Sequence, residues 1–282
     1  MKIGYITDTG TGRTPDYFKA KGIHCIPLQI ALDNKNYQDM EELSVEQCIE
    51  NMRNKKIMAT SLPSLGRMEE LFQQLQAENV QRIIAVPVCN GLSGTMEALR
   101  STAKRFDIPI TIFDTSVTAV IQEYLIEYIK ESIEKGISEN EIEINVTNVI
   151  ASCNTLIVPN DLQHLKRGGR LTPIAATLAG LLKIKPILYI NSVTHGRVDV
   201  LEKVRTFSRA LDRILDIITS SNPSEKTLIT FAHVNDEETA LMLKKRAEER
   251  FLSATIQIMD LPNTIAIHTG IKAQAIQYFN QV

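Results

Sequence analysis

The sequence lacks several features that would assign a protein to a class at once. None of its apolar runs, along 282 residues, is long enough to cross a membrane. Its first ten residues, MKIGYITDTG, contain a short strand-like apolar run but neither the longer apolar segment nor the small-residue cleavage site of a secretory signal. These absences predict a cytoplasmic protein.

Charge and metal-binding residues are equally unspecific. The formal net charge is -2, so no global basic surface indicates binding to nucleic acid or to a membrane surface. The four cysteines lack C-x-x-C spacing, which favours buried thiols over a zinc site or a disulfide framework. No pair of histidines has metal-ligand spacing with a third ligand, and we predict no metal site and no cofactor.

The pattern of apolar residues predicts an α/β fold. The length suffices for two domains, and short apolar runs alternate with longer stretches of helical period, which indicates crossover connections and a mostly parallel sheet. The expected strands include Ile3–Ile6, Ile83–Val88, Thr111–Phe113, Leu156–Val158, Pro186–Ile190, Leu228–Phe231 and Thr255–Met259. The expected helices include Met68–Leu75, Val117–Ile133, Val204–Ile218 and Glu237–Phe251. Ser138 and Glu141 form a predicted capping box, and Gly136 is predicted to end the helix before it.

A domain boundary is expected between residues 149 and 154, before a region with a Gly-Gly pair and closely spaced strands. We place it so that residues 1–152 form the first domain and residues 153–282 the second.

Two loops rich in hydroxyl groups are candidate anion sites. Val86–Thr95 runs from a strand into a turn that holds Ser93, Gly94 and Thr95, followed by a helix. Free amides at a helix start attract anions, and the hydroxyl groups add donors, although an ordinary helix cap explains the same residues. Thr60–Ser64 offers further hydroxyl groups before a helix with a proline in its first turn, and a cap by Ser61 or Ser64 explains that segment equally well.

Two segments of the second half are further candidates. Gly168 and Gly169 lie between basic residues, where a tight turn competes with a phosphate or partner contact that would include Arg170. His268 follows a short apolar run and precedes a glycine, a position where loop residues often have functional roles.

Two further patterns resemble parts of an enzyme site or a nucleotide site. Asp8 and Asp114 both begin Asp-Thr-Gly/Ser triplets, and such a pair supplies the carboxylates of an aspartic protease, but the long helical pattern after Asp114 argues against that almost all-β class. The Gly10–Arg13 segment lacks the third glycine of a dinucleotide site and the Lys-Ser/Thr ending of a P-loop, which leaves a flexible turn. A third alternative is a protein that only interacts with other proteins and binds no ligand.

Taken in order along nearly the whole chain, short segments of this sequence resemble the DegV family, whose members are similar to the fatty-acid-binding subunits of bacterial fatty acid kinase. The matching segments are Thr7-Asp8-Thr9, Tyr37-Gln38-Asp39, Thr60-Ser61-Leu62-Pro63-Ser64, Leu92-Ser93-Gly94-Thr95, Phe113-Asp114-Thr115, Gly168-Gly169-Arg170, Ile184-Lys185-Pro186-Ile187-Leu188, Val204-Arg205-Thr206 and His268-Thr269-Gly270.

The resemblance implies a two-domain protein with a mostly parallel sheet in the N-terminal domain and a mixed sheet with helices in the second. It implies a long-chain fatty acid in an internal tunnel, enclosed by the C-terminal domain. The protein would be a lipid carrier without ATP binding or catalysis of its own, which presents the carboxylate to a kinase partner in phospholipid metabolism.

The resemblance also implies which residues form the site. Thr60 and Ser93 would hydrogen-bond the carboxylate, amides around Ser61 and Gly94 would assist, and His268 would close the head-group site. Arg205, and with it Arg170, would face the kinase partner.

The sequence departs from the family pattern in three places. Cys89-Asn90 stands where the family usually has Ser-Ser, and Asp8-Thr9 and Asp114-Thr115 stand where it usually has Asp-Ser. Gly270-Ile271-Lys272 replaces the usual Gly-Pro-Gly after the histidine, so a bulky isoleucine takes the place of a compact turn.

Overall fold

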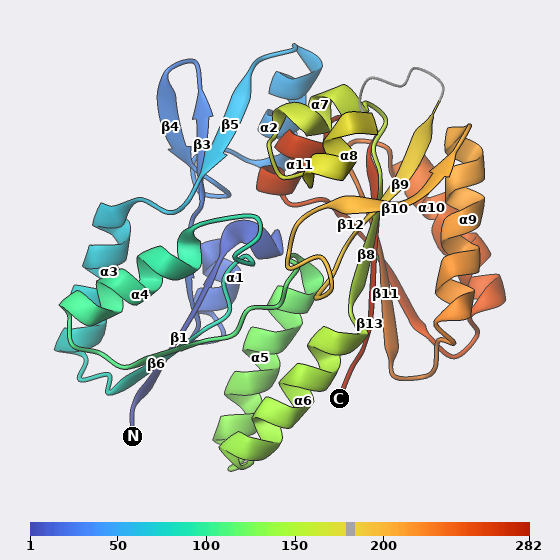
Figure 1. Ribbon diagram of the computed structural model, residues 1–282. Helices are drawn as coiled ribbons and strands as arrows, with labels where there is room; N and C mark the ends of the chain where they lie inside the picture. Colours follow the sequence, from blue (N-terminus) through green and yellow to red (C-terminus); the bar gives the residue numbers. More distant parts are fainter. Residues whose placement is uncertain (179–183) are drawn as a thin grey trace. The chain divides into compact units, whose positions relative to one another are not determined.

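The computed structural model describes residues 1–178 and 184–282, and within them the chain forms two compact units (Figure 1). Unit 1 comprises residues 1–143 and 262–264, and unit 2 comprises residues 144–261 and 265–282. The division therefore lies within a helix, and the predicted division after residue 152 stays a prediction. In the part of the chain that the structure describes, no helix is long and apolar enough to cross a bilayer.

Unit 1 is built on a four-stranded sheet in the order β2-β1-β6-β7, in which every pair of neighbours is parallel. Its strands are β1 (Ile3–Asp8), β2 (His24–Ile26), β6 (Arg82–Ala85) and β7 (Ile110–Ile112). Its connections include η1 (Thr9–Thr11), α1 (Pro15–Lys19), α3 (Leu65–Ala77), α4 (Thr95–Arg105) and α5 (Val120–Glu134). Buried side chains of α3 and α4 pack against β1 and β6 in one apolar cluster.

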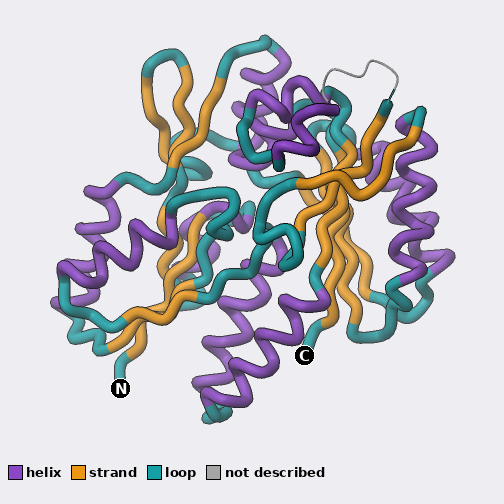
Figure 2. Tube along the Cα trace, viewed as in Figure 1, coloured by secondary structure: helices purple, strands orange, loops and turns teal. Residues whose placement is uncertain are grey.

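A small antiparallel sheet, β4-β3-β5, is a second group of strands in unit 1 (Figure 2). It contains β3 (Gln29–Leu32), β4 (Lys35–Gln38) and β5 (Met58–Ser61), with α2 (Val45–Arg53) between β4 and β5. Asp33 and Asn34 form the hairpin turn, both with positive φ, as expected of a two-residue turn between twisted strands.

Unit 2 contains a six-stranded mixed sheet in the order β10-β9-β8-β13-β11-β12, in which only β11 and β12 are a parallel pair among the described strands. Its strands are β8 (Asn154–Val158), β9 (Lys185–Ile190), β10 (Asp199–Val204), β11 (Thr227–His233), β12 (Thr255–Asp260) and β13 (Gln274–Asn280). The larger helices α9 (Phe207–Ser220) and α10 (Glu237–Arg250) bury their apolar residues in one cluster with this sheet.

Four further helices complete the described chain. They are α6 (Glu139–Ser152), α7 (Leu162–Arg167), α8 (Pro173–Thr177) and α11 (Asn263–Thr269). Both α6 and α11 contain residues of each unit.

The predicted fold class is confirmed: the first sheet is parallel, the second is mixed, and helices alternate with strands. Local details differ from the expectation. The helix after Thr60–Ser64 begins at Leu65 and Ser64 caps it, so Pro63 precedes the cap and is not in the first turn. Gly136 has the predicted left-handed conformation after α5, and the Ser138 hydroxyl accepts a hydrogen bond from the Glu141 amide.

Candidate functional site

The segment with Thr60 and Ser61 lies on β5, at the edge of the small antiparallel sheet. Thr60 is paired with Ile30 of β3, and it is half-buried, whereas Ser61 is exposed. Gln29 Nε2 donates a hydrogen bond to the Leu62 carbonyl at 3.0 Å, which fixes the chain as it leaves the strand. Ser64 is used locally, because its hydroxyl caps α3 at the Arg67 amide.

The loop with Ser93 and Gly94 leads into α4 and has a different arrangement from an ordinary cap. Its N-cap residue is Gly94, and no side chain makes the cap hydrogen bond. The hydroxyl groups of Ser93 and Thr95 are hydrogen-bonded to each other at 2.8 Å, and the Ser93 hydroxyl accepts the Thr95 amide at 3.3 Å. First-turn amides have no acceptor within their own helix, and this is the donor arrangement that suits an anion.

These two hydroxyl-bearing segments are neighbours in unit 1. A Cβ atom added to Gly94 would lie 3.7 Å from Leu62 Cδ2, which is van der Waals contact. Leu62 follows Thr60 by two residues, and Gly94 follows Ser93 directly. The four residues predicted to bind a carboxylate in unit 1 therefore come from two adjoining pieces of chain.

Asp8 is the buried group that supports the Val86–Thr95 loop. It is the last residue of β1 and is 1% exposed. Its Oδ2 accepts a hydrogen bond from the Val88 amide at 2.8 Å, and its Oδ1 accepts from the Gly10 amide at 2.9 Å and from Gln122 Nε2 at 2.8 Å. Burial raises the pKa of Asp8 to about 6, against the lowering effect of these three donors.

Gln122 of α5 connects Asp8 to its surroundings. Its Nε2 also donates to the Thr7 hydroxyl at 3.1 Å, and its Oε1 accepts from the Thr118 hydroxyl at 2.9 Å. A Cβ atom at Gly10 would lie 2.8 Å from Asp8 Oδ1 and 3.1 Å from Gln122 Oε1. Position 10 therefore requires glycine because the network leaves no room for a side chain, and the Gly10 turn has a structural role here.

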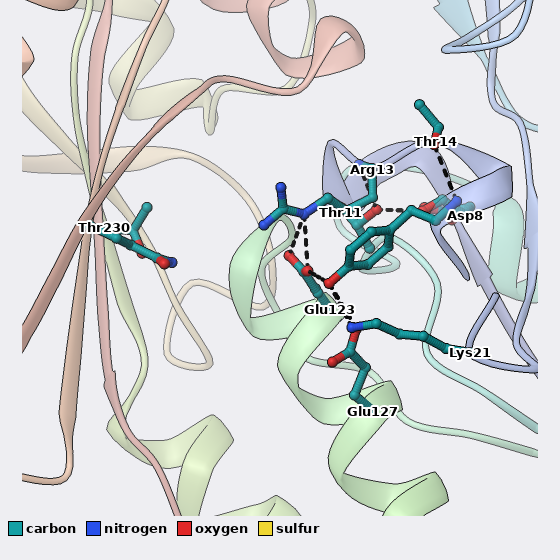
Figure 3. A network of polar contacts seen from close by, with 10 residues as sticks. Asp8, Thr11, Arg13, Thr14, Lys21, Glu123, Glu127 and Thr230 are labelled. Carbon is teal, nitrogen blue, oxygen red and sulfur yellow. Dashed lines mark hydrogen bonds and ion pairs between the residues drawn. The ribbon is translucent and has the colours of Figure 1, made fainter. Parts of the chain in front are cut away.

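A second, more exposed network joins α5 to the chain that follows Asp8 (Figure 3). Arg13 Nε donates to the Glu123 carboxylate at 2.9 Å, and Lys21 forms an ion pair with Glu127. The Tyr17 hydroxyl donates to Glu123 at 2.7 Å, so three residues near α1 hold two carboxylates of α5. This network fixes α5, and with it Gln122, against the loop after β1.

The structure gives Asp8 and Asp114 different surroundings. Asp114 is exposed, and its Oδ1 accepts the Ser116 amide at 2.8 Å in a local turn. Asp8 is buried and its oxygens are occupied by Val88, Gly10 and Gln122. An aspartic protease needs two carboxylates that share a proton, and this geometry offers no support for such a pair.

Asp39 is a second buried carboxylate, which sequence reasoning placed only within a family motif. It is 0% exposed, and its Oδ1 accepts a hydrogen bond from Asn263 Nδ2 at 3.0 Å. Burial raises the pKa of Asp39 to about 6, the Thr9 hydroxyl and the Asn263 amide lower it, and the charge of Asp8 raises it further. The charge of Asp8 thus acts on a second buried acid.

His268 of α11 lies within a compact group of unit 2. A Cβ atom at Gly168 would lie 2.6 Å from His268 Nδ1, so the ring occupies the space that a side chain at position 168 would need. Burial lowers the pKa of His268 to about 4, and the nearby Arg170 and His164 lower it further. His268 is therefore a neutral imidazole at neutral pH, beside a cation.

The surroundings of His268 explain the Gly168-Gly169-Arg170 segment. Gly169 has φ +70°, and Arg170 Nη1 donates to the Gly168 carbonyl at 2.7 Å, so the predicted tight turn is present and Arg170 is folded back on it. His164 Nε2 is hydrogen-bonded to the Ile267 carbonyl at 2.7 Å. The Gly168-Gly169-Arg170 segment is therefore a tight turn, and Gly168 in it lies against the His268 ring.

Arg205 lies apart from these groups in the chain, between the end of β10 and the start of α9, and it is exposed. The structure therefore brings the candidates together in two sets. Thr60, Ser61, Ser93 and Gly94 form one set in unit 1, and Arg170 and His268 form the other in unit 2. That both sets hold one head group stays a prediction.

Sequence reasoning missed the supporting roles of Asp8, Asp39 and Gln122. The sequence placed Asp8 in a triplet and in a family motif, and the useful signal was its position at the end of a buried strand. Its partner Val88 is 80 residues away, and Gln122 is 114 residues away. Spacing along the chain does not reveal contacts of that range.

Comparison with known families places the whole chain in one of them. The model of the DegV family, a family of uncharacterised proteins, matches residues 2–281. The chain belongs to the DegV family. A DegV domain-containing protein of Staphylococcus aureus is 26% identical over 266 residues, which are 94% of each chain.

Two solved structures of DegV proteins are also similar over the full length. A fatty acid binding DegV family protein from Streptococcus agalactiae is 27% identical, with a TM-score of 0.89 and 100% of each chain covered. DegV from Bacillus subtilis, a fatty acid binding protein, is 25% identical, with a TM-score of 0.86 and the same coverage. The fold described above is therefore that of this family.

Proposed function

We propose that this DegV protein binds a long-chain fatty acid in an internal tunnel and presents its carboxylate to a fatty acid kinase. The main support is the full-length likeness to the Streptococcus agalactiae protein, which is described as fatty acid binding. The adjoining hydroxyl loops of unit 1 agree with a carboxylate site, since Leu62 lies against Gly94. The tunnel itself stays a prediction.

The head group would be held mainly by neutral donors. In this proposal the hydroxyl groups of Thr60 and Ser93 donate to the carboxylate, and the amides near Ser61 and Gly94 assist. His268 closes the site as a neutral imidazole, a state supported by its pKa of about 4. Such donors orient the ligand without the cost of burying a further full charge beside it.

The acyl chain would supply most of the affinity. Burial of one methylene is favourable by about 0.8 kcal/mol, so a long chain gains on the order of 10 kcal/mol before the costs of association are subtracted. A hydrogen bond contributes about 1 kcal/mol net. We infer that the protein selects ligands by the shape of the tunnel and uses the hydroxyl loops to fix the end of the molecule.

Native mass spectrometry of freshly purified protein tests the proposal, because a carrier should retain fatty acids of the expression host. Ser93→Ala and Thr60→Ala should each lower the bound fraction by removing one head-group donor, with affinity about fivefold weaker for a loss of about 1 kcal/mol. Ser208→Ala is the matched control, since Ser208 is an exposed serine on α9.

One result would contradict the carrier function, and another would contradict only the assignment of the site residues. Protein that neither carries a fatty acid nor takes up added palmitate after lipid removal would overturn the carrier function and favour an interaction protein. Full lipid occupancy and unchanged affinity in both loop variants would overturn only the assignment of Thr60 and Ser93.

A further inference from the structure

The loop that carries Ser93 and Gly94 leaves the parallel sheet at a defined point. The Val86 amide donates to the Ile6 carbonyl at 3.0 Å, which continues the pairing of β1 with β6, and the Val86 carbonyl accepts the Thr7 hydroxyl at 2.8 Å. Two residues later the Val88 amide donates to Asp8 Oδ2. Backbone pairing thus gives way to a contact with a side chain just before the loop turns.

The three contacts of Asp8 favour an ionised carboxylate. Asp8 accepts three N–H donors, two on Oδ1 and one on Oδ2, and a proton on either oxygen would face one of these donors. An asparagine has the same shape but offers one acceptor oxygen, so its amide group would oppose either Val88 or the Gly10 and Gln122 pair. The charged form accepts from all three donors at full strength, whereas a protonated oxygen is a weaker acceptor.

We propose that Asp8 is a positioning residue, whose ionised carboxylate holds the Val86–Thr95 loop in the conformation that presents Ser93 and Gly94 to the ligand's head group. This inference rests on the proposed function for its ligand. Asp8 itself does not touch the ligand in this proposal. It acts through the Val88 amide, five residues before Ser93.

Burial and the surrounding hydrogen-bond donors together set the pKa of Asp8. The titratable groups that sense it are Asp39, Cys25 and Cys89, none of them a cation, because the charge of Asp8 raises the pKa of each. Arg13 of the adjoining network is paired with Glu123. Burial therefore dominates, and Asp8 takes up a proton as the pH falls through about 6.

The test compares Asp8→Asn with Asp114→Asn in the full-length protein. Asp114 is a matched control because it lies two residues after a strand of the parallel sheet and, like Asp8, accepts an amide two residues later, but it is exposed. Hydrogen exchange of the amides of residues 88–95 reports the loop without any ligand. Titration of lipid-free protein with palmitate between pH 5 and pH 8 reports the head-group site.

We expect Asp8→Asn to speed exchange in the loop and to weaken palmitate binding about tenfold at pH 7.5. Wild-type affinity should fall as the pH decreases through about 6, and this step should be missing in Asp8→Asn and retained in Asp114→Asn. Palmitate titrates equally in all three proteins, so the difference between the profiles belongs to Asp8.

Gln122→Met provides a second test that does not depend on the folding of Asp8→Asn. The Gln122 amide lowers the pKa of Asp8, so its removal should move the acidic step to higher pH while the Val88 contact remains. A step that stays in place in Gln122→Met would overturn the proposal, as would loop exchange in Asp8→Asn equal to that in Asp114→Asn. If the wild-type protein binds no palmitate at any pH, the carrier function fails, and the exchange experiment still decides the role of Asp8.

Discussion

Two buried ionisable side chains, Asp39 and His268, make opposite contributions to stability as the pH changes. The pKa of Asp39 is raised from 3.8 to about 6, so its contribution to stability is fully present below pH 3.8 and is lost as the pH rises through about 6. The pKa of His268 is lowered from 6.5 to about 4, so its contribution is present above pH 6.5 and is lost as the pH falls toward 4.

We predict that Asp39→Asn stabilises the protein at neutral pH. The amide oxygen can still accept the hydrogen bond from Asn263, and the other position, Oδ2, has no hydrogen-bond partner among the described residues. Removal of the buried charge favours the variant by at most about 3 kcal/mol at pH 7, since one pKa unit corresponds to about 1.4 kcal/mol. An amide donor without an acceptor at the Oδ2 position offsets part of this gain, so the free energy of unfolding should rise by about 1 kcal/mol.

Urea unfolding at several pH values checks this prediction. The difference between Asp39→Asn and the wild type should shrink as the pH falls from 7 to 4, because the native wild type protonates Asp39 over that range. Asp33→Asn is the control: Asp33 is 61% exposed in its pair with Lys56, and its loss should change stability by less than about 1 kcal/mol. A less stable Asp39→Asn at pH 7 would show that the carboxylate is needed there.

Residue-scale prediction from sequence succeeded where a side chain acts close to its own backbone position. Ser64 and Ser138 are examples, because both were expected to cap a helix and their hydroxyl groups accept the amides of Arg67 and Glu141. The partner of Asp39, in contrast, is Asn263, 224 residues away. Which amide meets which carboxylate depends on the folded chain, so that contact could not be read from spacing.

At the scale of elements, the turn after α11 shows how one departure from the family pattern is accommodated. Lys272 stands where the family usually has glycine, and its φ is +64°. Its amide donates to the Val234 carbonyl at 2.8 Å, so the left-handed conformation is needed to join α11 to β13. A residue with a Cβ atom is strained in this conformation, and glycine is not.

Lys272→Gly should therefore stabilise the protein, by about 0.5 to 1 kcal/mol, because relief of the left-handed strain exceeds the added flexibility of the unfolded chain. The midpoint of thermal unfolding measures the effect. Lys272→Ala keeps the strain and removes the same exposed side chain, so it should leave the midpoint close to the wild-type value. Equal midpoints in both variants would mean that the turn is not strained.

Elements with a buried apolar run were predictable, and those defined by their neighbours were not. The hydrophobic runs of β1 and β11 and the helical period of α9 appear in the structure close to the expected places. β4 has the sequence KNYQ with two exposed residues, so it lacks a core face and is a strand only because β3 pairs with it. β10 is also hard to predict from its sequence. A register shift between Val200 and Glu202 interrupts its pairing with β9, so its side chains do not follow one regular alternation.

For the whole molecule, the proposed partnership with a kinase can be tested at Arg205, which is exposed. Arg205 lies where β10 passes into α9, and Thr206 behind it caps the helix with its hydroxyl at the Arg209 amide. The arginine is therefore presented on a fixed junction of two regular elements. A charge in this setting can guide a partner without taking part in the fold.

Arg205→Glu should retain its fatty acid yet fail as a substrate carrier. Reversal of an exposed charge leaves the fold intact but opposes an acidic partner surface, so acyl-phosphate formation with a purified fatty acid kinase should fall at least tenfold. Lys226→Glu is the control, because Lys226 is an exposed lysine before β11 and undergoes the same charge change. Normal acyl-phosphate formation by Arg205→Glu would remove Arg205 from the interface.

Sequence alone was sufficient at this scale for the fold class, because alternation of strands and helices and a full-length family resemblance are global properties. It was insufficient for the assembly of the site. The segments that contain Thr60 and Ser93 meet where Leu62 contacts Gly94, and the His268 ring occupies the space that a side chain at position 168 would need. Both relations arise from tertiary packing, which a one-dimensional pattern does not specify.

The path of the chain between the two units has one more consequence. Residues 262–264 belong to unit 1 while the residues on both sides belong to unit 2, so a single break between residues 143 and 144 would not separate the units. The later fragment would take Asn263 with it and leave Asp39 in the earlier fragment without its amide. Two fragments expressed from separate genes would each lack part of a unit. Residues 262–264 of the second fragment would have to bind to the first fragment to complete unit 1.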